Sequence, residues 1–156
     1  MEIKINYHVH DHWHELNTAD RNLVEQSISI AQQAYAPYSK FHVGAALLLK
    51  NGEIVLGNNQ ENIAYPSGMC AERTALFYVG AHYPNEHIEK LVIYAFGDLQ
   101  ADGEPVSPCG GCRQVISETI MRQGIGFELI LVGKNGKVVR FANALDLLPF
   151  PFGFSS

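Results

Sequence analysis

Cysteines and basic residues are both scarce in this sequence. The chain has three cysteines in 156 residues, and 11 lysines and arginines against 16 aspartates and glutamates, which gives a formal net charge of −5. Long polyanions bind to basic surfaces, so we expect neither DNA nor long RNA as a substrate. An odd number of cysteines, two of them in a C-x-x-C pattern, argues against a secreted disulfide framework. It is typical of metal binding or redox chemistry in a reducing compartment.

Long apolar runs are missing as well. No stretch of the sequence is apolar for long enough to span a bilayer. The N-terminus also lacks the basic region and apolar run that mark a signal peptide. We therefore expect a cytoplasmic protein without a membrane partner. With 47% hydrophobic residues, the chain can build the core of a single domain.

The hydrophobic pattern predicts an alternation of strands and helices. A helix is expected from Thr18 to just before Pro37. Further helices are expected at 70–81, 108–122 and 145–148, and strands at 41–49, 53–57, 88–96, 127–132 and 137–141. Asn51-Gly52 and Asn135-Gly136 are two-residue hairpin signals. This order indicates an α/β fold, with a five-stranded mixed sheet, helices on its faces and an antiparallel last hairpin.

Residues 1–17 are predicted to be an extension that precedes a domain spanning residues 18–156. Apolar residues alternate with polar ones from Ile3 to Val9, which is the pattern of a short amphipathic strand. Histidines occupy positions 8, 10, 12 and 14. We interpret them as solvated or interface side chains. The alternative is metal binding, because His10-Asp11-x-x-His14 faintly echoes a zinc-protease motif, although that motif needs a glutamate and a helix.

All three cysteines lie in two short motifs, Cys70-Ala-Glu-Arg and Pro108-Cys-Gly-Gly-Cys-Arg-Gln. Each motif is predicted to begin a helix, where free N–H groups and the helix dipole favour thiolates. Three thiolates, from Cys70, Cys109 and Cys112, suit a zinc ion with one open position, which is the mark of a catalytic zinc site. A structural site usually needs a fourth protein ligand, and no histidine lies near either motif.

Two charged residues follow Cys70 directly. Glu72 is predicted to transfer protons, because C-x-E spacing brings its carboxylate within plausible reach of the open zinc position. Three thiolates leave the site with excess negative charge, and Arg73 is predicted to offset it by hydrogen bonding to sulfur. Each residue could instead be an ordinary surface residue of a helix. Arg113 also follows a ligand, but no separate argument assigns it a role.

The two motifs closely resemble those of the zinc cytidine deaminases. The likeness extends over residues 18–153 and includes Ala34-Tyr-Ala-Pro-Tyr-Ser-Lys-Phe41, Val43-Gly-Ala-Ala-Leu-Leu48 and Asn59-Gln-Glu-Asn-Ile-Ala-Tyr65. It implies a three-layer α-β-α sandwich, a bound Zn²⁺ and hydrolytic deamination of cytidine and 2′-deoxycytidine in pyrimidine salvage.

The resemblance also implies the residues that bind the nucleoside. Asn59 and Glu61 correspond to a ribose-binding pair. Phe41 corresponds to an aromatic wall, and Ala71 supplies backbone groups to the base. Tyr65 and Phe152 correspond to residues that close the pocket, often across a subunit boundary. The three-cysteine members are usually homotetramers, so a homotetramer is expected here.

Some alternatives stay open at this point. A related zinc deaminase could act on another aminated base or nucleoside, such as blasticidin S. In the family, the polynucleotide and tRNA enzymes place a helix between the last two strands, which the Asn135-Gly136 turn disfavours. Ile63 stands where a small residue is common, and Gly111 replaces a frequent alanine; we expect the first to bear on substrate range. A redox or structural-zinc module without catalysis is the remaining alternative.

Overall fold

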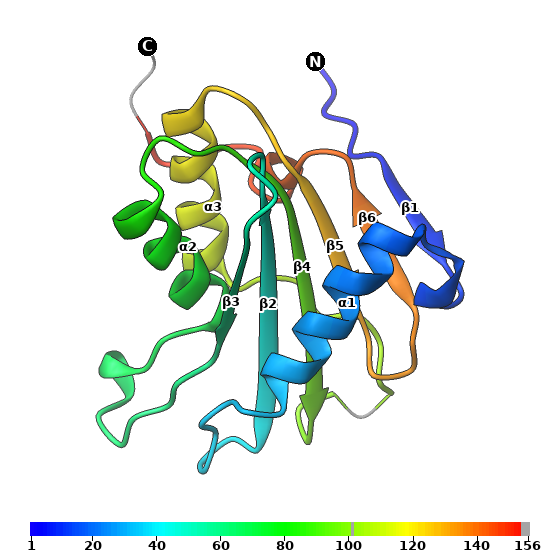
Figure 1. The fold of residues 1–156 in the computed structure, drawn as a ribbon, viewed down its shortest axis with the longest axis vertical. Coiled ribbons are helices and arrows are strands. Elements are labelled where there is room, and N and C mark those ends of the chain that lie inside the picture. The colour runs from blue at the N-terminus through cyan, green and yellow to red at the C-terminus, as the bar shows by residue number, and fades with distance from the viewer. Residues whose placement is uncertain (101, 154–156) are drawn as a thin grey trace.

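A six-stranded mixed sheet forms the centre of the molecule in the computed structural model, which describes residues 1–100 and 102–153 (Figure 1). The strands are β1 (Tyr7–His10), β2 (Phe41–Leu49), β3 (Ile54–Asn58), β4 (Ile88–Gly97), β5 (Glu128–Val132) and β6 (Val138–Phe141), in the spatial order β1-β6-β5-β4-β2-β3. The α-helices are α1 (Thr18–Ala31), α2 (Ala71–His82) and α3 (Gly110–Gln123). Short 3-10 helices span Trp13–Glu15, Tyr65–Ser67 and Ala144–Leu147.

The sheet has one strand more than the five predicted. The alternating segment near the N-terminus forms a strand only over Tyr7–His10, and this strand joins the sheet at its edge by pairing antiparallel with β6. The prediction was wrong because an alternating pattern identifies a strand without identifying its partner. Residues 7–10 are therefore an integral part of the sheet.

The remaining pairings follow from the turns and crossovers. The β2–β3 and β5–β6 pairs are antiparallel, as the two Asn-Gly signals predict, and Gly52 and Gly136 both have φ of 90°. β4 and β5 are parallel, so the chain must cross over between them, and α3 makes that crossover. The last hairpin is thus antiparallel, with a turn rather than a helix between its strands.

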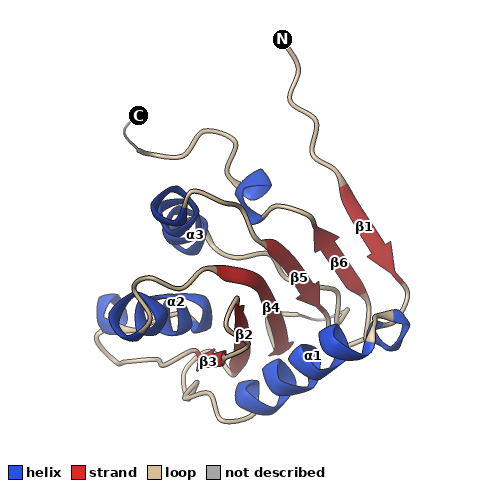
Figure 2. Ribbon diagram, turned by 45° about the horizontal axis from the view of Figure 1, so that its top comes forward, coloured by secondary structure: helices blue, strands red, loops and turns tan. Residues whose placement is uncertain are grey.

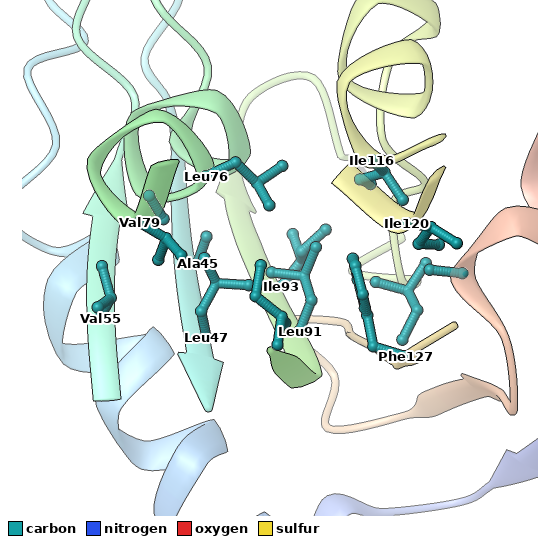
Figure 3. Packing of buried hydrophobic residues seen from close by; sticks show 14 of the residues in the cluster. Ala45, Leu47, Val55, Leu76, Val79, Leu91, Ile93, Ile116, Ile120 and Phe127 are labelled. Carbon is teal, nitrogen blue, oxygen red and sulfur yellow. The ribbon is translucent and has the colours of Figure 1, made fainter. Parts of the chain in front are cut away.

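Helices cover both faces of the sheet, which gives three layers (Figure 2). On one face α1 packs on a buried cluster that includes Leu23, Val24, Val92 and Ile130. On the other face α2 and α3 lie side by side over a larger cluster (Figure 3). Leu76 and Val79 of α2, Ile116 and Ile120 of α3, and Leu47, Leu91 and Ile93 of the strands belong to this second cluster.

The first helix ends earlier than predicted. It spans Thr18–Ala31 rather than reaching Pro37, and its N-cap is Asn17, whose side chain accepts a hydrogen bond from the Asp20 N–H at 2.9 Å. After Ala31 the chain leaves the helix because the Tyr35 N–H donates to the carbonyl of Asn59 at 3.1 Å. The local sequence pattern cannot predict this long-range contact.

The position of α2 depends on a glycine in the neighbouring strand. A Cβ atom added to Gly57 would lie 2.6 Å from the carbonyl oxygen of Ala71 and 2.7 Å from the nitrogen of Ala75. Only glycine lets the first turn of α2 approach β3 this closely. Because α2 begins directly after Cys70, Gly57 also positions a predicted metal ligand. Within the described residues, no helix has the length and apolarity needed to cross a membrane.

Candidate metal centre and pocket

The three cysteines lie at the N-terminal ends of the two helices that share one face of the sheet. Cys70 is the N-cap of α2 and Cys109 is the N-cap of α3, and neither cap side chain accepts a capping hydrogen bond from a backbone N–H of its helix. Cys112 follows in the first turn of α3 and is fully buried. The sulfur atoms therefore lie where unpaired helix N–H groups and the helix dipole stabilise negative charge.

These sulfur atoms are close enough to share one ion. The Sγ atoms of Cys70 and Cys109 are 3.9 Å apart, those of Cys109 and Cys112 are 3.5 Å apart, and all three lie within 4.8 Å of one another. Tetrahedral zinc with Zn–S bonds of about 2.3 Å needs sulfur separations of about 3.8 Å. The donor set thus fits Zn²⁺, and it fills three of four tetrahedral positions. Among the described residues, no other three histidine, cysteine or carboxylate side chains bring their ligand atoms this close together.

Arg73 reaches this cluster as the sequence predicts. Its guanidinium lies 3.4 Å from the Sγ of Cys70. The hydrogen bond from the Cys112 thiol and the guanidinium of Arg73 together lower the pKa of Cys70 to about 5. The same bond to Cys70 and burial raise the pKa of Cys112, since a second thiolate beside the first is unfavourable. A dication among the sulfurs removes this penalty, which is how metal binding releases thiol protons.

Glu72 is almost completely buried, with 5% of its surface exposed, and it lines the same cavity as the ligands. Burial, followed by the nearby charge of Cys70, raises the pKa of Glu72 to about 6. A carboxyl group with a pKa near neutrality can both accept and release a proton at working pH. An ordinary first-turn glutamate on a helix surface would be exposed, so burial favours the catalytic interpretation.

A cavity of about 630 Å³ opens beside the metal cluster. It contains most of the predicted site residues, namely Phe41, Asn59, Glu61, Tyr65, Cys70, Ala71, Glu72, Arg73 and Cys109. Phe152 does not line the cavity of its own chain. It is 83% exposed, and its backbone N–H and carbonyl both bond to the side chain of Gln114 on α3.

Asn59 and Glu61 line the same cavity, and each is held by hydrogen bonds to neighbouring segments. The Asn59 side chain pairs with the backbone of β2, accepting from the Val43 N–H at 2.8 Å and donating to the Phe41 carbonyl at 2.9 Å. One amide hydrogen and one lone pair of Asn59 remain for a ligand. This residue therefore fixes the end of β2 as well as facing the cavity.

Ser39 is a site residue that sequence reasoning missed. Its hydroxyl donates to one carboxylate oxygen of Glu61, while the N–H groups of Tyr38 and Ser39 donate to the other oxygen at 2.9 and 3.3 Å. Burial opposes ionisation of this carboxyl, but these hydrogen bonds outweigh it and lower the pKa of Glu61. These contacts join residues 22 and 23 positions apart in the chain, so no local pattern predicts them. The only available signal was the place of Ser39 in the PYSKF segment of the resemblance.

Two further contacts were also missed. Arg113 donates to the carbonyls of Pro108, at 2.8 Å, and Leu147, at 3.1 Å. It therefore ties the loop before Cys109 to the C-terminal segment. The cavity also has an apolar wall, formed by Val43, Ile93, Ala95 and Val106. The inward period of β2 and β4 could have indicated the first three of these residues.

The histidines near the N-terminus do not gather into a comparable cluster. His12 accepts a hydrogen bond from the His14 N–H at 3.2 Å and, with Glu15, caps the 3-10 helix at 13–15. The His10 ring lies 3.6 Å from the Glu15 carboxylate. Among the described residues, only the three cysteines lie close enough together to share a metal ion, and the histidines of this segment form no such group.

Comparison with known proteins agrees with this geometry. Residues 17–125 match the family described as the cytidine and deoxycytidylate deaminase zinc-binding region. A cytidine deaminase from Halalkalibacterium halodurans is 44% identical over 96 residues, which cover 62% of this chain and 68% of that protein. One from Mycobacterium tuberculosis is 36% identical over 123 residues, covering 79% of this chain and 81% of that one.

Solved structures show the same relationship. The crystal structure of cytidine deaminase from Burkholderia pseudomallei superimposes with a TM-score of 0.73 at 36% identity, covering 88% of this chain and 100% of that chain. The Mycobacterium tuberculosis enzyme superimposes with a TM-score of 0.66 at 30% identity. The match of sequence, fold and cysteine cluster leads to one conclusion: this chain belongs to the family of zinc-binding cytidine and deoxycytidylate deaminases.

Proposed function

We propose that this protein catalyses the hydrolytic deamination of cytidine and 2′-deoxycytidine to uridine and 2′-deoxyuridine, with release of ammonia. The observation that carries the proposal is that two of the three clustered cysteines, Cys70 and Cys109, line one cavity together with the buried Glu72 and with Glu61. The named relatives are cytidine deaminases, and they support this choice of substrate.

The thiolates of Cys70, Cys109 and Cys112 would hold zinc, which supplies a Lewis acid that makes water a nucleophile near neutral pH. Glu72 accepts a proton from the attacking water and delivers it to N3 of the base as the new C4–O bond forms. Glu72 then carries the second water proton to the amino nitrogen. The C4–N4 bond breaks, ammonia leaves, and the product keeps its hydrogen on N3, so all atoms are accounted for.

Arg73 has a supporting role in this proposal. Three thiolates around a divalent cation leave one excess negative charge, which makes the metal a weaker Lewis acid. The guanidinium beside Cys70 draws electron density from that sulfur through a charge-assisted contact of 3.4 Å. Arg73 is thus a positioning and charge-tuning residue rather than a proton donor.

The part of the cavity lined by Asn59 and Glu61 is proposed to bind the sugar. Glu61 accepts hydrogen bonds from the ribose hydroxyls, and Asn59 donates to them. Phe41 packs beside the ligand, and the backbone of Ala71 contacts the base edge. The carboxylate of Glu61 is ionised, since the pKa of this group is lowered, and an ionised carboxylate is a strong acceptor for a hydroxyl.

The pocket is proposed to be completed by neighbouring subunits in a homotetramer. Ile63, Tyr65 and Phe152 are 79%, 76% and 83% exposed, which is unusual for large apolar side chains and supports burial against another copy. The catalytic residues are proposed to lie within residues 18–156, to whose sheet β1 adds an edge strand. The acidic charge agrees with a free nucleoside rather than a polynucleotide. A place in pyrimidine salvage and a cytoplasmic location also remain proposals.

A substrate panel tests this function. Purified zinc-loaded protein is mixed with cytidine, 2′-deoxycytidine, adenosine, guanine or blasticidin S, and turnover is followed by ultraviolet absorbance. The proposal predicts rapid loss of the cytidine and 2′-deoxycytidine absorbance and production of ammonia in equal amount. Turnover of blasticidin S with none of cytidine would replace the proposed substrate while keeping the reaction class.

A further inference from the structure

The outer edge of the N-terminal strand, and the residues just before this strand, have no pairing partner among the described residues of this chain. β1 is the last strand of the sheet, and within the described residues no strand pairs with its outer side (Figures 1 and 2). An exposed strand edge presents a row of N–H and C=O groups that can pair with another strand. Only His8 and His10 are polar on β1, and neither is a lysine or proline of the kind that blocks such pairing.

The strand pattern also begins before the paired strand does. Ile3, Ile5, Tyr7 and Val9 alternate with polar residues, yet only residues 7–10 pair with β6. The reason is the length of β6, which ends at Phe141, after which the chain turns into the 3-10 helix at Ala144–Leu147. Residues 1–6 pass beyond the end of β6, and as a result a segment with strand character has no strand beside it.

Tyr7 and Val9 share one face of β1, and the apolar residues that precede them are also uncovered. Tyr7 and Val9 lie directly opposite Phe141 and Val139 of β6, and the rings of Tyr7 and Phe141 are 5.9 Å apart. Ile3, Ile5, Tyr7 and Val9 nevertheless keep 54%, 42%, 58% and 49% of their surface exposed. A row of half-exposed apolar residues along a sheet edge is a site for another strand of the same pattern.

We propose that β1 and the residues before it pair antiparallel with the same segment of a second copy of this chain, about a two-fold axis at Ile5. The two sheets would then be continuous across the contact. This pairing is distinct from any contact that completes the substrate cavity, because it uses the opposite edge of the sheet from β3. It does not depend on the proposed reaction.

The charges of the segment select the register. Directly opposed residues point to the same face, so the apolar positions must oppose one another, which leaves registers centred on a residue. Centring on Lys4 would oppose two lysines, and centring on Asn6 would oppose Lys4 to His8. Centring on Ile5 instead opposes Ile3 to Tyr7, Lys4 to Asn6 and Glu2 to His8, so Lys4 faces neither another lysine nor a histidine.

Single cysteines introduced into the full-length, zinc-loaded chain test the pairing and its register. Opposed residues have Cβ atoms about 4.5–5.5 Å apart, which a disulfide can bridge after a small adjustment. The Ile5→Cys chain should form a disulfide-linked dimer with oxidised glutathione. Ile3→Cys and Tyr7→Cys should each stay monomeric on a non-reducing gel but form a cross-linked dimer when mixed.

The matched control is Ile125→Cys, since Ile125 is also an exposed apolar residue, at 56%, and lies after α3, away from the N-terminal segment. It should remain unlinked, as should the wild-type chain. Equal linking of Ile125→Cys and Ile5→Cys would show collision rather than pairing and would overturn the proposal. Absence of a disulfide-linked dimer of Ile5→Cys would overturn the pairing. A disulfide-linked dimer formed by Ile3→Cys without Tyr7→Cys would overturn the register. Deamination by wild-type protein is measured separately, so failure of one proposal leaves the other standing.

Discussion

The guanidinium of Arg73 lies 3.4 Å from the sulfur of Cys70, three residues before it in the chain. Cys70 caps α2 and Arg73 lies in its first turn, so one helical turn places a metal ligand and a cation in contact. The contact supplies positive charge to a group of three thiols that would otherwise carry only negative charge. We therefore expect Arg73 to raise the reaction rate without being needed to bind the metal.

Replacing Arg73 with glutamine should separate metal binding from reactivity. The three thiols remain, so Arg73→Gln should still bind one zinc per chain. We expect kcat to fall by about ten- to a hundredfold, the usual effect of removing a hydrogen bond to a metal ligand. Zinc content and kcat are measured on the same sample, with Arg21→Gln, on α1 and outside the cavity, as a control that removes the same charge. Full activity in a fully loaded Arg73→Gln protein would contradict the role.

Replacing Glu72 should remove proton transfer and spare the metal. Glu72→Gln has nearly the same size and fits the same buried position, but it cannot accept a proton. We expect kcat to fall by about a hundred- to ten-thousandfold, the range attributed to general acid–base catalysis. Glu118→Gln on the exposed side of α3 is the matched control and should leave kcat unchanged. Equal turnover by Glu72→Gln and wild type would remove this residue from the mechanism.

The hydroxyl of Ser39 should matter through Glu61. Ser39→Ala removes a hydrogen bond to a carboxylate, which is worth about 1.5–3 kcal/mol, so KM for cytidine should rise by about ten- to a hundredfold. Since Ser39 bonds to Glu61, the proposed sugar-binding residue, and not to Glu72, kcat should change little. Ser39→Thr retains the hydroxyl and should recover most of the affinity. A similar loss with free cytosine, which has no ribose, would show that Ser39 acts elsewhere.

The close approach of α2 to β3 predicts opposite effects for two glycines. In Gly57→Ala the new methyl meets the backbone of Ala71 and Ala75, so we expect a loss of about 1–3 kcal/mol of stability and weaker zinc retention. In Gly80→Ala, on α2 itself, the nearest atom is 3.7 Å away, and the free energy of unfolding should rise by up to about 1 kcal/mol. Chemical denaturation of both variants measures the difference. Equal stability would mean that β3 does not position α2.

Local sequence was enough to identify most elements of the fold. The boundaries of β2 were predicted at Phe41 and Leu49 as the structure has them, because an apolar run and an Asn-Gly turn define both ends. The end of α1 and the partner of β1 were not predictable in this way. Both depend on contacts with residues far away in the chain, Asn59 for α1 and the β6 strand for β1.

The site shows the same division. The cysteines, Glu72 and Arg73 could be assigned because their chemistry is restrictive and their spacing is short. Ser39 and Arg113 could not, because what matters is a partner, Glu61 or the Leu147 carbonyl, that only the fold brings near. Phe152 lies outside the cavity of its own chain, so its predicted place in the pocket depends on the proposed neighbouring subunit.

The central claim is that three sulfur atoms hold one metal ion whose remaining position serves the reaction. Its most direct test is a titration of zinc into metal-stripped protein, with bound metal and cytidine turnover measured at each step. We predict no turnover without metal, a linear rise with bound zinc, and a plateau at one zinc per chain. Full turnover by the metal-free protein, or a bound zinc that restores none, would contradict the account.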